Sequence, residues 1–480
     1  MAQAEREHLS VVMFPWLAHG HITPYLELAR RLTSEDGGDV NVTVHLVSTP
    51  VNLSAMRQQT PRIRFVELHL PAALDLPPAL HTTKHLPARL MPALKRACDL
   101  AAPRFGALLD ELRPDLLLFD FLYPWAPLEA ASRGVPAVHL STCSAAATSF
   151  MVHWFGRARA GRAFPFQGVG LGGAEEEAKY TSLLLREHPD GLVPERDRLL
   201  LSLARSSGFV AIKTCADIER PYMGYLSELL GGKEMVPIGP LLVDGSDTGG
   251  GTTSPEPDRV TRWLDLQSPA SVVLVSFGSE YFMSEQQLAR MARGLELSGE
   301  RFVWVVRFPK GDEGDAAARA LPRGFAPAPG RGLVVEGWAP QRRVLAHPAC
   351  GAFLSHCGWS SVLESLAAGV PIVALPLHID QPLGANLAAE LGAAVRVPQE
   401  RFGEFRAEDV ARTVRRAMRG EESRALRRHA AELREVVARN DADDAQVAAL
   451  VQRMARLCGT TSADVSFFFF KQKTAYEIHR

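Results

Sequence analysis

The sequence lacks an excess of either charge and has no hydrophobic run long enough to cross a membrane. Lys and Arg together number 53 and Asp and Glu 54, which leaves a net charge of −1. This balance argues against a basic surface for nucleic acid or for an anionic membrane. A membrane-spanning helix needs about 20 consecutive apolar residues, and the polar start MAQAEREHLS contains no apolar signal core. We therefore expect neither a membrane span nor a nucleic-acid partner.

Cysteine is also scarce. The 480 residues contain six cysteines, far fewer than the density of a disulfide scaffold. They are scattered, and their spacing is not that of metal ligands. We expect reduced thiols, a cytoplasmic location and no structural metal. The cysteines are Cys98, Cys143, Cys215, Cys350, Cys357 and Cys458.

The chain does contain alternating short apolar runs and helical stretches, which are typical of βα repeats. The polar stretch Gly245–Pro257, GSDTGGGTTSPEP, interrupts this alternation as a linker would. We expect an α/β protein with two Rossmann-like, doubly wound domains that face each other across a cleft. The domains are predicted over residues 1–240 and 259–458, with a linker over 241–258. The predicted strands are Leu9–Pro15, Val42–Thr49, Arg62–Leu68, Asp115–Asp120, Pro136–Thr142, Ser271–Phe277, Phe302–Phe308, Gly332–Glu336, Gly351–Ser355 and Pro371–Leu377.

Three further segments complete this outline. Leu90–Leu112 has helical character, and so does the longer segment Arg406–Arg456. It contains the triplet Asp441-Ala442-Asp443, which we interpret as a solvent-facing surface and not as a metal site. Residues 466–480 include four consecutive phenylalanines without helical period. We expect this tail to be non-native and leave it out of the fold.

Residues 338–381 carry the strongest functional signal. The apolar run Gly351–Ser355 predicts a buried strand, and a His356-Cys357-Gly358 turn then precedes a helix start. A helix N-terminus offers unpaired backbone N–H groups and a positive dipole end, which suit a phosphate. Alone, Ser361 and Glu364 indicate only a capping box. After a histidine turn at a strand end, they favour a diphosphate site.

Two other features in this region fit a nucleotide sugar. Trp338 follows a predicted strand and precedes a Pro-Gln turn, which places the indole at the edge of a sheet as a ring to stack on. Asp380 and Gln381 follow another apolar strand. A carboxylate beside an amide can hold neighbouring sugar hydroxyls through directed hydrogen bonds.

Transfer of a sugar to a hydroxyl needs a base, because a free hydroxyl is a weak nucleophile. His19 and His21 both follow the first predicted strand, where active sites of open α/β sheets lie. On this argument either histidine can serve. Asp120 ends an apolar strand, and a carboxylate bonded to the base would fix its tautomer. A terminal Asp is common in strands, but beside a histidine at a parallel strand end it predicts a dyad.

The order W-x-P-Q, H-C-G-W, S-x-x-E, G-V-P and D-Q resembles the signature box of the plant UDP-sugar glycosyltransferases. The resemblance covers about residues 8–458. Gly20–Pro24 matches the family pattern G-H-x-x-P and selects His21 as the base, with Asp120 as its partner. The resemblance implies two facing domains of the GT-B type, a C-terminal helix that crosses back onto the first domain, a UDP-sugar donor, no cofactor and no metal. Because donor and acceptor then lie on opposite domains, direct attack should invert the anomeric carbon. The implied donor-site residues are Ser279, Trp338, Ala339, Gln341, His356, Trp359, Ser360, Ser361, Glu364, Asp380 and Gln381.

Within this site the resemblance also implies individual roles. Uracil stacks on Trp338, His356 contacts a phosphate, and Glu364 accepts from the ribose hydroxyls. Asp380 and Gln381 hold the hexose. Glutamine at the last position goes mostly with glucose, although relatives that use rhamnose or xylose also carry it.

Two departures from the common family pattern concern the acceptor. Ser360 stands where the box more often has Asn, and the turn at 278–282 reads Gly-Ser-Glu-Tyr-Phe. Both resemble the branch-forming group that adds a sugar to one already on a flavonoid, terpenoid or apocarotenoid. We expect a glycoside acceptor, with Glu280 as a candidate contact.

Other functions remain open at this stage. The same chemistry on a free aglycone is the first, and a nucleotide-sugar-binding protein without activity is the second. The presence of both His21 and Asp120 argues against the second. A nucleotide-sugar epimerase is disfavoured because the box and G-H-x-x-P occur together.

Overall fold

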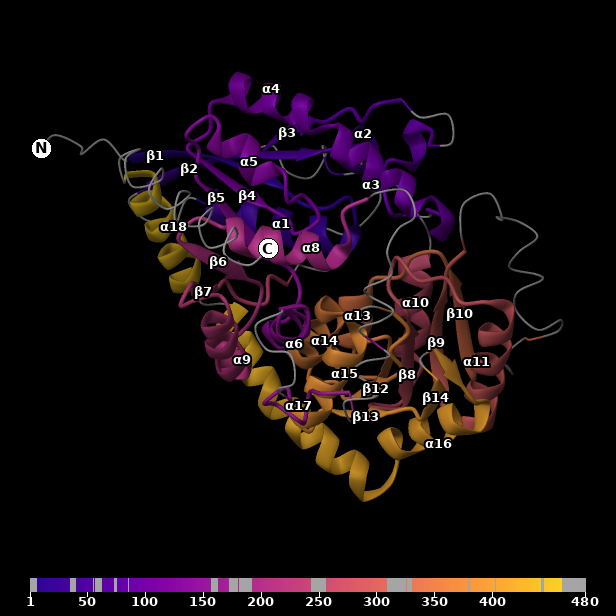
Figure 1. Cartoon of the computed structure of the whole chain (residues 1–480). Helices are drawn as coiled ribbons and strands as arrows, with labels where there is room; N and C mark the ends of the chain where they lie inside the picture. The colour runs from indigo at the N-terminus through magenta and orange to yellow at the C-terminus, as the bar shows by residue number, and fades with distance from the viewer. Residues whose placement is uncertain are drawn as a thin grey trace, which may run out of the picture.

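The computed structural model describes residues 7–34, 40–54, 56, 63–72, 76–84, 86–156, 163–171, 180, 192–242, 256–308, 325, 330–378, 380–401, 403–441 and 444–459. Its core consists of two parallel sheets with helices packed around them (Figure 1). The strands of the first sheet are β1 Glu7–Phe14, β2 Val40–Ser48, β3 Arg64–Glu67, β4 Leu116–Phe119, β5 Ala137–Ser141, β6 Phe209–Ile212 and β7 Glu234–Pro237. Their order in the sheet is β3-β2-β1-β4-β5-β6-β7.

The second sheet repeats this arrangement with six strands. They are β8 Val272–Ser276, β9 Arg301–Val306, β10 Gly332–Glu336, β11 Cys350–Ser355, β12 Ile372–Ala374 and β13 Ala394–Arg396. Their order is β10-β9-β8-β11-β12-β13. An antiparallel pair, β14 Gln399–Arg401 and β15 Glu404–Phe405, lies outside this sheet.

The helices of the first half include two short 3-10 turns. They are α1 His19–Leu32, α2 Pro50–Leu53, η1 Pro78–Leu80, η2 Ala88–Leu90, α3 Met91–Leu100, α4 Ala102–Leu112, α5 Ala126–Ala131, α6 Ala145–Phe155, α8 Glu195–Arg205 and α9 Ala216–Leu229. The helices of the second half are α10 Glu256–Asp265, α11 Glu285–Ser298, α13 Gln341–Leu345, α14 Trp359–Ala368, α15 Gln381–Glu390, α16 Ala407–Met418, α17 Gly420–Asp441 and α18 Asp444–Gly459.

The strands form where the sequence is continuously apolar. Every residue of β4, LLLF, and of β8, VVLVS, is buried, as expected for central strands of a parallel sheet that is covered on both faces. Each of the ten predicted strands corresponds to an observed one, with ends that differ by up to three residues where described. β6, β7 and β13 were not predicted.

Both sheets follow the strand order of a Rossmann fold, which places a crevice between the first and fourth strands. In the first sheet that position lies between β1 and β4, and in the second between β8 and β11. His21 follows β1 and Asp120 follows β4, whereas Ser279 follows β8 and His356 follows β11. The topology therefore brings the predicted residues to the two switch points.

The two halves share an apolar core. Residues of α6, α8 and α9 cluster with residues of α14 and α15, among them Phe150, Leu203, Trp359 and Leu363. Beyond them, α17 leads into α18, which returns to the first domain along one side of the molecule (Figure 1). Leu450 of α18 is fully buried there. The C-terminal helical region of the structure thus packs against the first domain.

Asp441 corrects the prediction of a solvent-facing D-x-D. Its Oδ1 accepts a 2.6 Å hydrogen bond from Arg31 Nη2, and its carbonyl oxygen accepts a 2.8 Å bond from Arg31 Nη1. Because Arg31 belongs to α1, the end of α17 is tied to the first domain. Ala442 and Asp443 lie outside the described residues.

The structure refines three segment boundaries. The predicted helix Leu90–Leu112 is two helices, because Pro103 stands in the first turn of α4 and the chain bends at Ala101. At the predicted linker, Leu241 and Leu242 are buried and α10 already begins at Glu256. The remainder of that linker, 243–255, and the tail 466–480 lie outside the described residues.

Candidate active site

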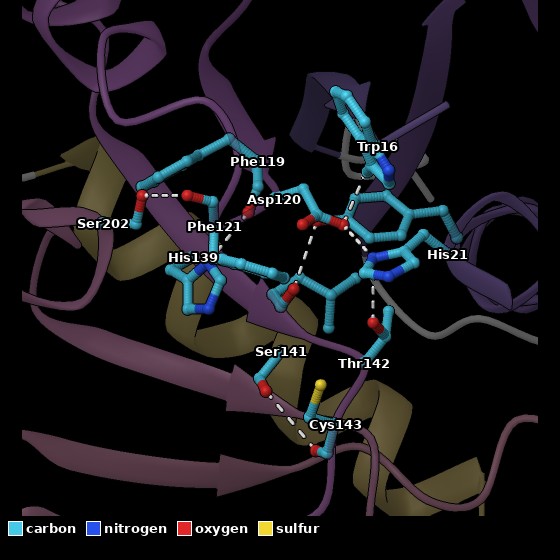
Figure 2. A network of polar contacts seen from close by, with 12 residues as sticks. Trp16, His21, Phe119, Asp120, Phe121, His139, Ser141, Thr142, Cys143 and Ser202 are labelled. Carbon is cyan, nitrogen blue, oxygen red and sulfur yellow. Dashed lines mark hydrogen bonds and ion pairs between the residues drawn. The ribbon is translucent and has the colours of Figure 1, made fainter. Parts of the chain in front are cut away.

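His21 and Asp120 form a direct pair. The two atoms His21 Nδ1 and Asp120 Oδ2 are 2.7 Å apart, and the side chain of Asp120 is 1 % exposed whereas that of His21 is 17 % exposed. Asp120 Oδ2 also accepts a 3.3 Å bond from the Trp16 backbone N–H, and Thr142 Oγ1 lies 3.1 Å from His21 Nδ1 (Figure 2). Because a carboxylate only accepts, we place the proton on Nδ1. Nε2 of His21 then has a lone pair and can take a proton.

The pKa of His21 is raised above its ordinary value. Burial alone would lower this pKa, but the charge of Asp120 and the hydrogen bond to it outweigh that effect. Glu280 and Asp380 raise it further. Both belong to the second domain, so His21 experiences charges from both sides of the cleft.

Two neighbouring histidines lack these properties. The His19 side chain is exposed. Desolvation by the protein around it, together with the charges of Lys84 and Arg307, lowers its pKa to about 4. His139 is buried, its Nδ1 lies 3.1 Å from the carbonyl oxygen of Phe119, and burial lowers its pKa to about 4. Of these three histidines, His21 is the one that bonds to Asp120, which favours it over His19 as the candidate base.

In the second domain, two glycines hold His356. Gly278 has φ of +73°, which suits glycine. A Cβ atom there would lie 2.6 Å from His356 Nε2, and one on Gly358 would lie 2.8 Å from the same atom. Burial lowers the pKa of His356 to about 4. This side chain therefore offers a neutral N–H group beside the turn that contains Ser279.

α14 begins directly after this histidine. Gly358 occupies its N-cap position without a side-chain cap, and the first turn contains no acidic residue. Ser361 and Glu364 lie inside the helix, so the capping-box interpretation is wrong. At a helix N-terminus, phosphate is bound by the unpaired backbone N–H groups of the first turn. The start of α14 offers such groups.

The residues predicted to bind the nucleoside lie at the same sheet edge. Trp338 follows β10 and is 38 % exposed, unlike a core tryptophan. Gln341 Nε2 donates to Glu364 Oε2 over 2.8 Å and to Ser361 Oγ over 3.2 Å. Burial raises the pKa of Glu364. The neighbouring Ala339 is buried, whereas the indole of Trp338 is exposed.

The acid-amide pair lies at the start of α15. Gln381 Oε1 accepts hydrogen bonds from the backbone N–H groups of Leu377 at 2.9 Å and of His378 at 2.8 Å. Its amide oxygen is thus engaged by its own loop, whereas its NH₂ group forms no hydrogen bond with any of the described residues. Burial raises the pKa of Asp380, and the Cys143 thiol of the first domain is among the groups that oppose this shift.

Trp359 and Ser360 face the opposite domain. Trp359 Nε1 donates to the carbonyl oxygen of Lys213 over 2.7 Å, and Lys213 Nζ donates to Ser360 Oγ over 2.6 Å. The indole of Trp359 is therefore part of the domain interface. Its backbone N–H remains in the first turn of α14.

Sequence reasoning missed three polar residues at this cleft. Thr142 follows β5, Lys213 follows β6, and Thr83 Oγ1 donates to Glu280 Oε1 across the cleft over 2.8 Å. The first two are polar residues directly after a strand, the same signal that indicated Asp120. Lys213 was missed because β6 was not recognised.

The described residues include neither a metal-binding cluster nor a membrane-spanning helix. No group of three or more His, Cys, Asp or Glu residues among them is placed to hold a metal ion. No helix in the described ranges combines the length and apolarity that crossing a membrane requires.

The molecule has two facing Rossmann-like domains. One contains a histidine bonded to an aspartate, and the other contains a helix N-terminus of the kind that binds phosphate. This combination is that of a transferase of the GT-B type. Comparisons with known proteins agree. Residues 7–242 match the protein family described as "Glycosyltransferase, N-terminal domain". Residues 236–426 match the family described as "UDP-glucoronosyl and UDP-glucosyl transferase".

Individual relatives are similar over most of their length. UDP-glucosyltransferase 29 of Panax ginseng is 39 % identical over 436 residues, which cover 89 % of this chain and 92 % of that protein. Beta-D-glucosyl crocetin beta-1,6-glucosyltransferase of Gardenia jasminoides is 40 % identical over 428 residues, which cover 86 % and 92 %. The structure of Phytolacca americana UGT2 complexed with UDP-2fluoro-glucose and pterostilbene has a TM-score of 0.72 at 25 % identity, covering 94 % of this chain and 100 % of that chain.

The chain belongs to the plant UDP-glycosyltransferase family. The predicted α/β fold with two Rossmann-like domains and the predicted enzyme class are confirmed.

Proposed function

We propose that this glycosyltransferase moves glucose from UDP-glucose to a hydroxyl of a sugar that is already attached to a small molecule. The carrying observation is the contact between Thr83 and Glu280 at the cleft. Glu280 raises the pKa of His21, and Arg307 lowers that of His19. Charged groups of both domains, Lys84 of the first and Glu280 and Arg307 of the second, thus act on these two histidines. A site built to bond hydroxyls discriminates strongly against ligands that lack them.

The relatives support the same acceptor class. The name of the Gardenia jasminoides enzyme states that it acts on a glucosyl crocetin and forms a beta-1,6 linkage. At 40 % identity over most of both chains, that acceptor chemistry is a reasonable guide.

The reaction we propose is a single displacement. His21 Nε2 takes the proton of the acceptor hydroxyl while the oxygen of that hydroxyl bonds to the anomeric carbon of the donor. The bond between that carbon and the β-phosphate oxygen breaks, and its electron pair stays on UDP. Asp120 stabilises the imidazolium that forms, as the aspartate of a catalytic triad does. Attack from the side opposite the leaving group inverts the anomeric centre.

For the donor, we assign roles from the geometry of the second domain. The exposed indole of Trp338 stacks on uracil, and Glu364 accepts from the ribose hydroxyls. The first turn of α14, with His356 and Ser279, binds the diphosphate, so this activity is expected without a metal ion. The NH₂ group of Gln381 and the carboxyl group of Asp380 bind the hexose.

We also propose that the enzyme acts in the cytoplasm. All six cysteines are free thiols, four of them buried, as suits a reducing compartment. A fluorescent fusion and cell fractionation test the location, and recovery in the secretory pathway would contradict it.

The acceptor assignment is tested with matched pairs, each an aglycone and its own monoglucoside, using UDP-glucose as donor. We expect higher kcat/KM for the monoglucoside in each active pair. A consistent preference for the aglycone would overturn the glycoside assignment and leave glucosylation of a small phenol or terpenol.

A further inference from the structure

Lys213 is a buried cation that crosses from the first domain to the start of α14. It directly follows β6, and its side chain is 2 % exposed. Its Nζ lies 2.6 Å from Ser360 Oγ, and its carbonyl oxygen accepts from Trp359 Nε1. Lys213 therefore contacts both of the first two residues of the helix whose N-terminus is the proposed diphosphate site.

The position is electrostatically unfavourable for an ammonium group. Cations are stabilised near the C-terminus of a helix and opposed by the dipole at its N-terminus. A buried charge also needs a partner, and among the described residues no carboxylate forms an ion pair with Lys213. Burial lowers the pKa of Lys213 to about 8, with Glu364 opposing this shift. An anion at the start of α14 would remove the surplus of positive charge.

The groups beside Lys213 at the start of α14 do not supply a full positive charge for an anion. His356 is kept neutral by burial, which lowers its pKa to about 4, so it donates a hydrogen bond without a full charge. Ser360 has a shorter side chain than the Asn more common at this position of the box. Its hydroxyl is the atom that Lys213 Nζ contacts.

We infer that Lys213 binds the diphosphate of the donor from the acceptor domain and stabilises UDP as it departs. This inference rests on the proposed donor site at α14. As the acceptor oxygen bonds to the anomeric carbon and the bond to the β-phosphate oxygen breaks, UDP gains one negative charge. The proton of the acceptor goes to His21. A cation fixed beside the phosphate favours this charge more in the transition state than in the bound donor.

The test separates a diphosphate contact from a structural tie between the domains. Lys213→Gln removes the charge but keeps a hydrogen-bond donor for Ser360, and Lys213→Arg keeps the charge. Lys213→Met serves if Lys213→Gln does not fold. The matched control is Lys233→Met, because Lys233 is a lysine whose pKa burial lowers to about 8 and whose Nζ donates to backbone carbonyls of Leu203, Ala204 and Ser206. Calorimetry then gives Kd for UDP and for uridine, which lacks phosphates.

We expect Lys213→Gln to weaken UDP binding roughly tenfold or more, the range for a lost charge-assisted hydrogen bond. Uridine binding should be unchanged, and kcat should fall about 10²-fold, as for a lost oxyanion contact. Lys213→Arg should recover part of both losses, and Lys233→Met should leave the ratio of the two Kd values at its wild-type level.

Two results would overturn the inference. An equal loss of UDP and uridine binding would show that Lys213 only ties the domains together. Unchanged UDP binding and kcat would show that its charge does not act on the diphosphate. A wild-type protein that bound no UDP would refute the donor site itself, and the inference with it.

Discussion

His21 and Asp120 are 99 residues apart in the chain, yet their side chains meet over 2.7 Å because β1 and β4 are neighbouring strands. The pair lies at the switch point of the first sheet, and the start of α14 follows the corresponding switch point of the second. The proposed base therefore lies in the first domain and the helix start proposed to bind the diphosphate lies in the second, which allows each to be altered independently.

Asp120→Asn tests the orientation of the base. Asn preserves the size of the side chain but can leave His21 with its proton on the wrong nitrogen, so kcat should fall by roughly 10²–10⁴-fold. The carboxylate raises the pKa of His21, and only the neutral ring can accept a proton. Wild-type activity should therefore decline as pH falls through a value above 6.5, the ordinary value. In the variant this decline should move to lower pH. A full rate with an unaltered pH profile would show that Asp120 is only the end of a strand.

Gln381→Ala tests the hexose contact. The variant loses the NH₂ group proposed to bind the sugar, so KM for UDP-glucose should rise roughly threefold to tenfold, while Kd for UDP stays the same. Gln399→Ala is the matched control, because Gln399 Nε2 bonds to the carbonyl oxygen of Pro376 in the same segment. An equal loss of UDP and UDP-glucose binding, or the same loss in the control, would assign Gln381 to loop structure alone.

Metal independence is tested by chelation. If helix N–H groups and protein side chains bind the diphosphate, the rate should be the same in EDTA as in Mg²⁺ or Mn²⁺. The assay measures initial rates with protein that has been dialysed against EDTA. Loss of activity that either cation restores would contradict the proposed diphosphate site.

The sequence predicted those parts of the fold that local pattern determines. Long apolar runs such as those of β4 and β8 identify themselves, because both faces of these strands are buried. β7, EMVP, and β13, AVR, contain a charge or are three residues long, and such segments are not distinguished from loops. The histidine and aspartate at strand ends were found because parallel strands end at a common edge.

Contacts between distant segments could not be predicted in this way. Asp441 reads as a surface acid until the end of α17 meets α1, which places Arg31 beside it. Gln381 reads as a free amide, but its oxygen is engaged by two backbone N–H groups of its own loop. The contact of Lys213 with Ser360 depends on how the two domains meet. Each is set by tertiary packing, about which the local pattern carries no information.

The central claim is that His21 of the first domain is the base for a donor held by the second. Its most direct test is His21→Ala, with kcat measured on an active glycoside and Kd for UDP measured by calorimetry. We predict that kcat falls by roughly 10²–10⁴-fold with Kd for UDP unchanged, whereas the control His19→Ala keeps most of the activity. Near wild-type turnover in His21→Ala, or a large loss in His19→Ala alone, would contradict the assignment.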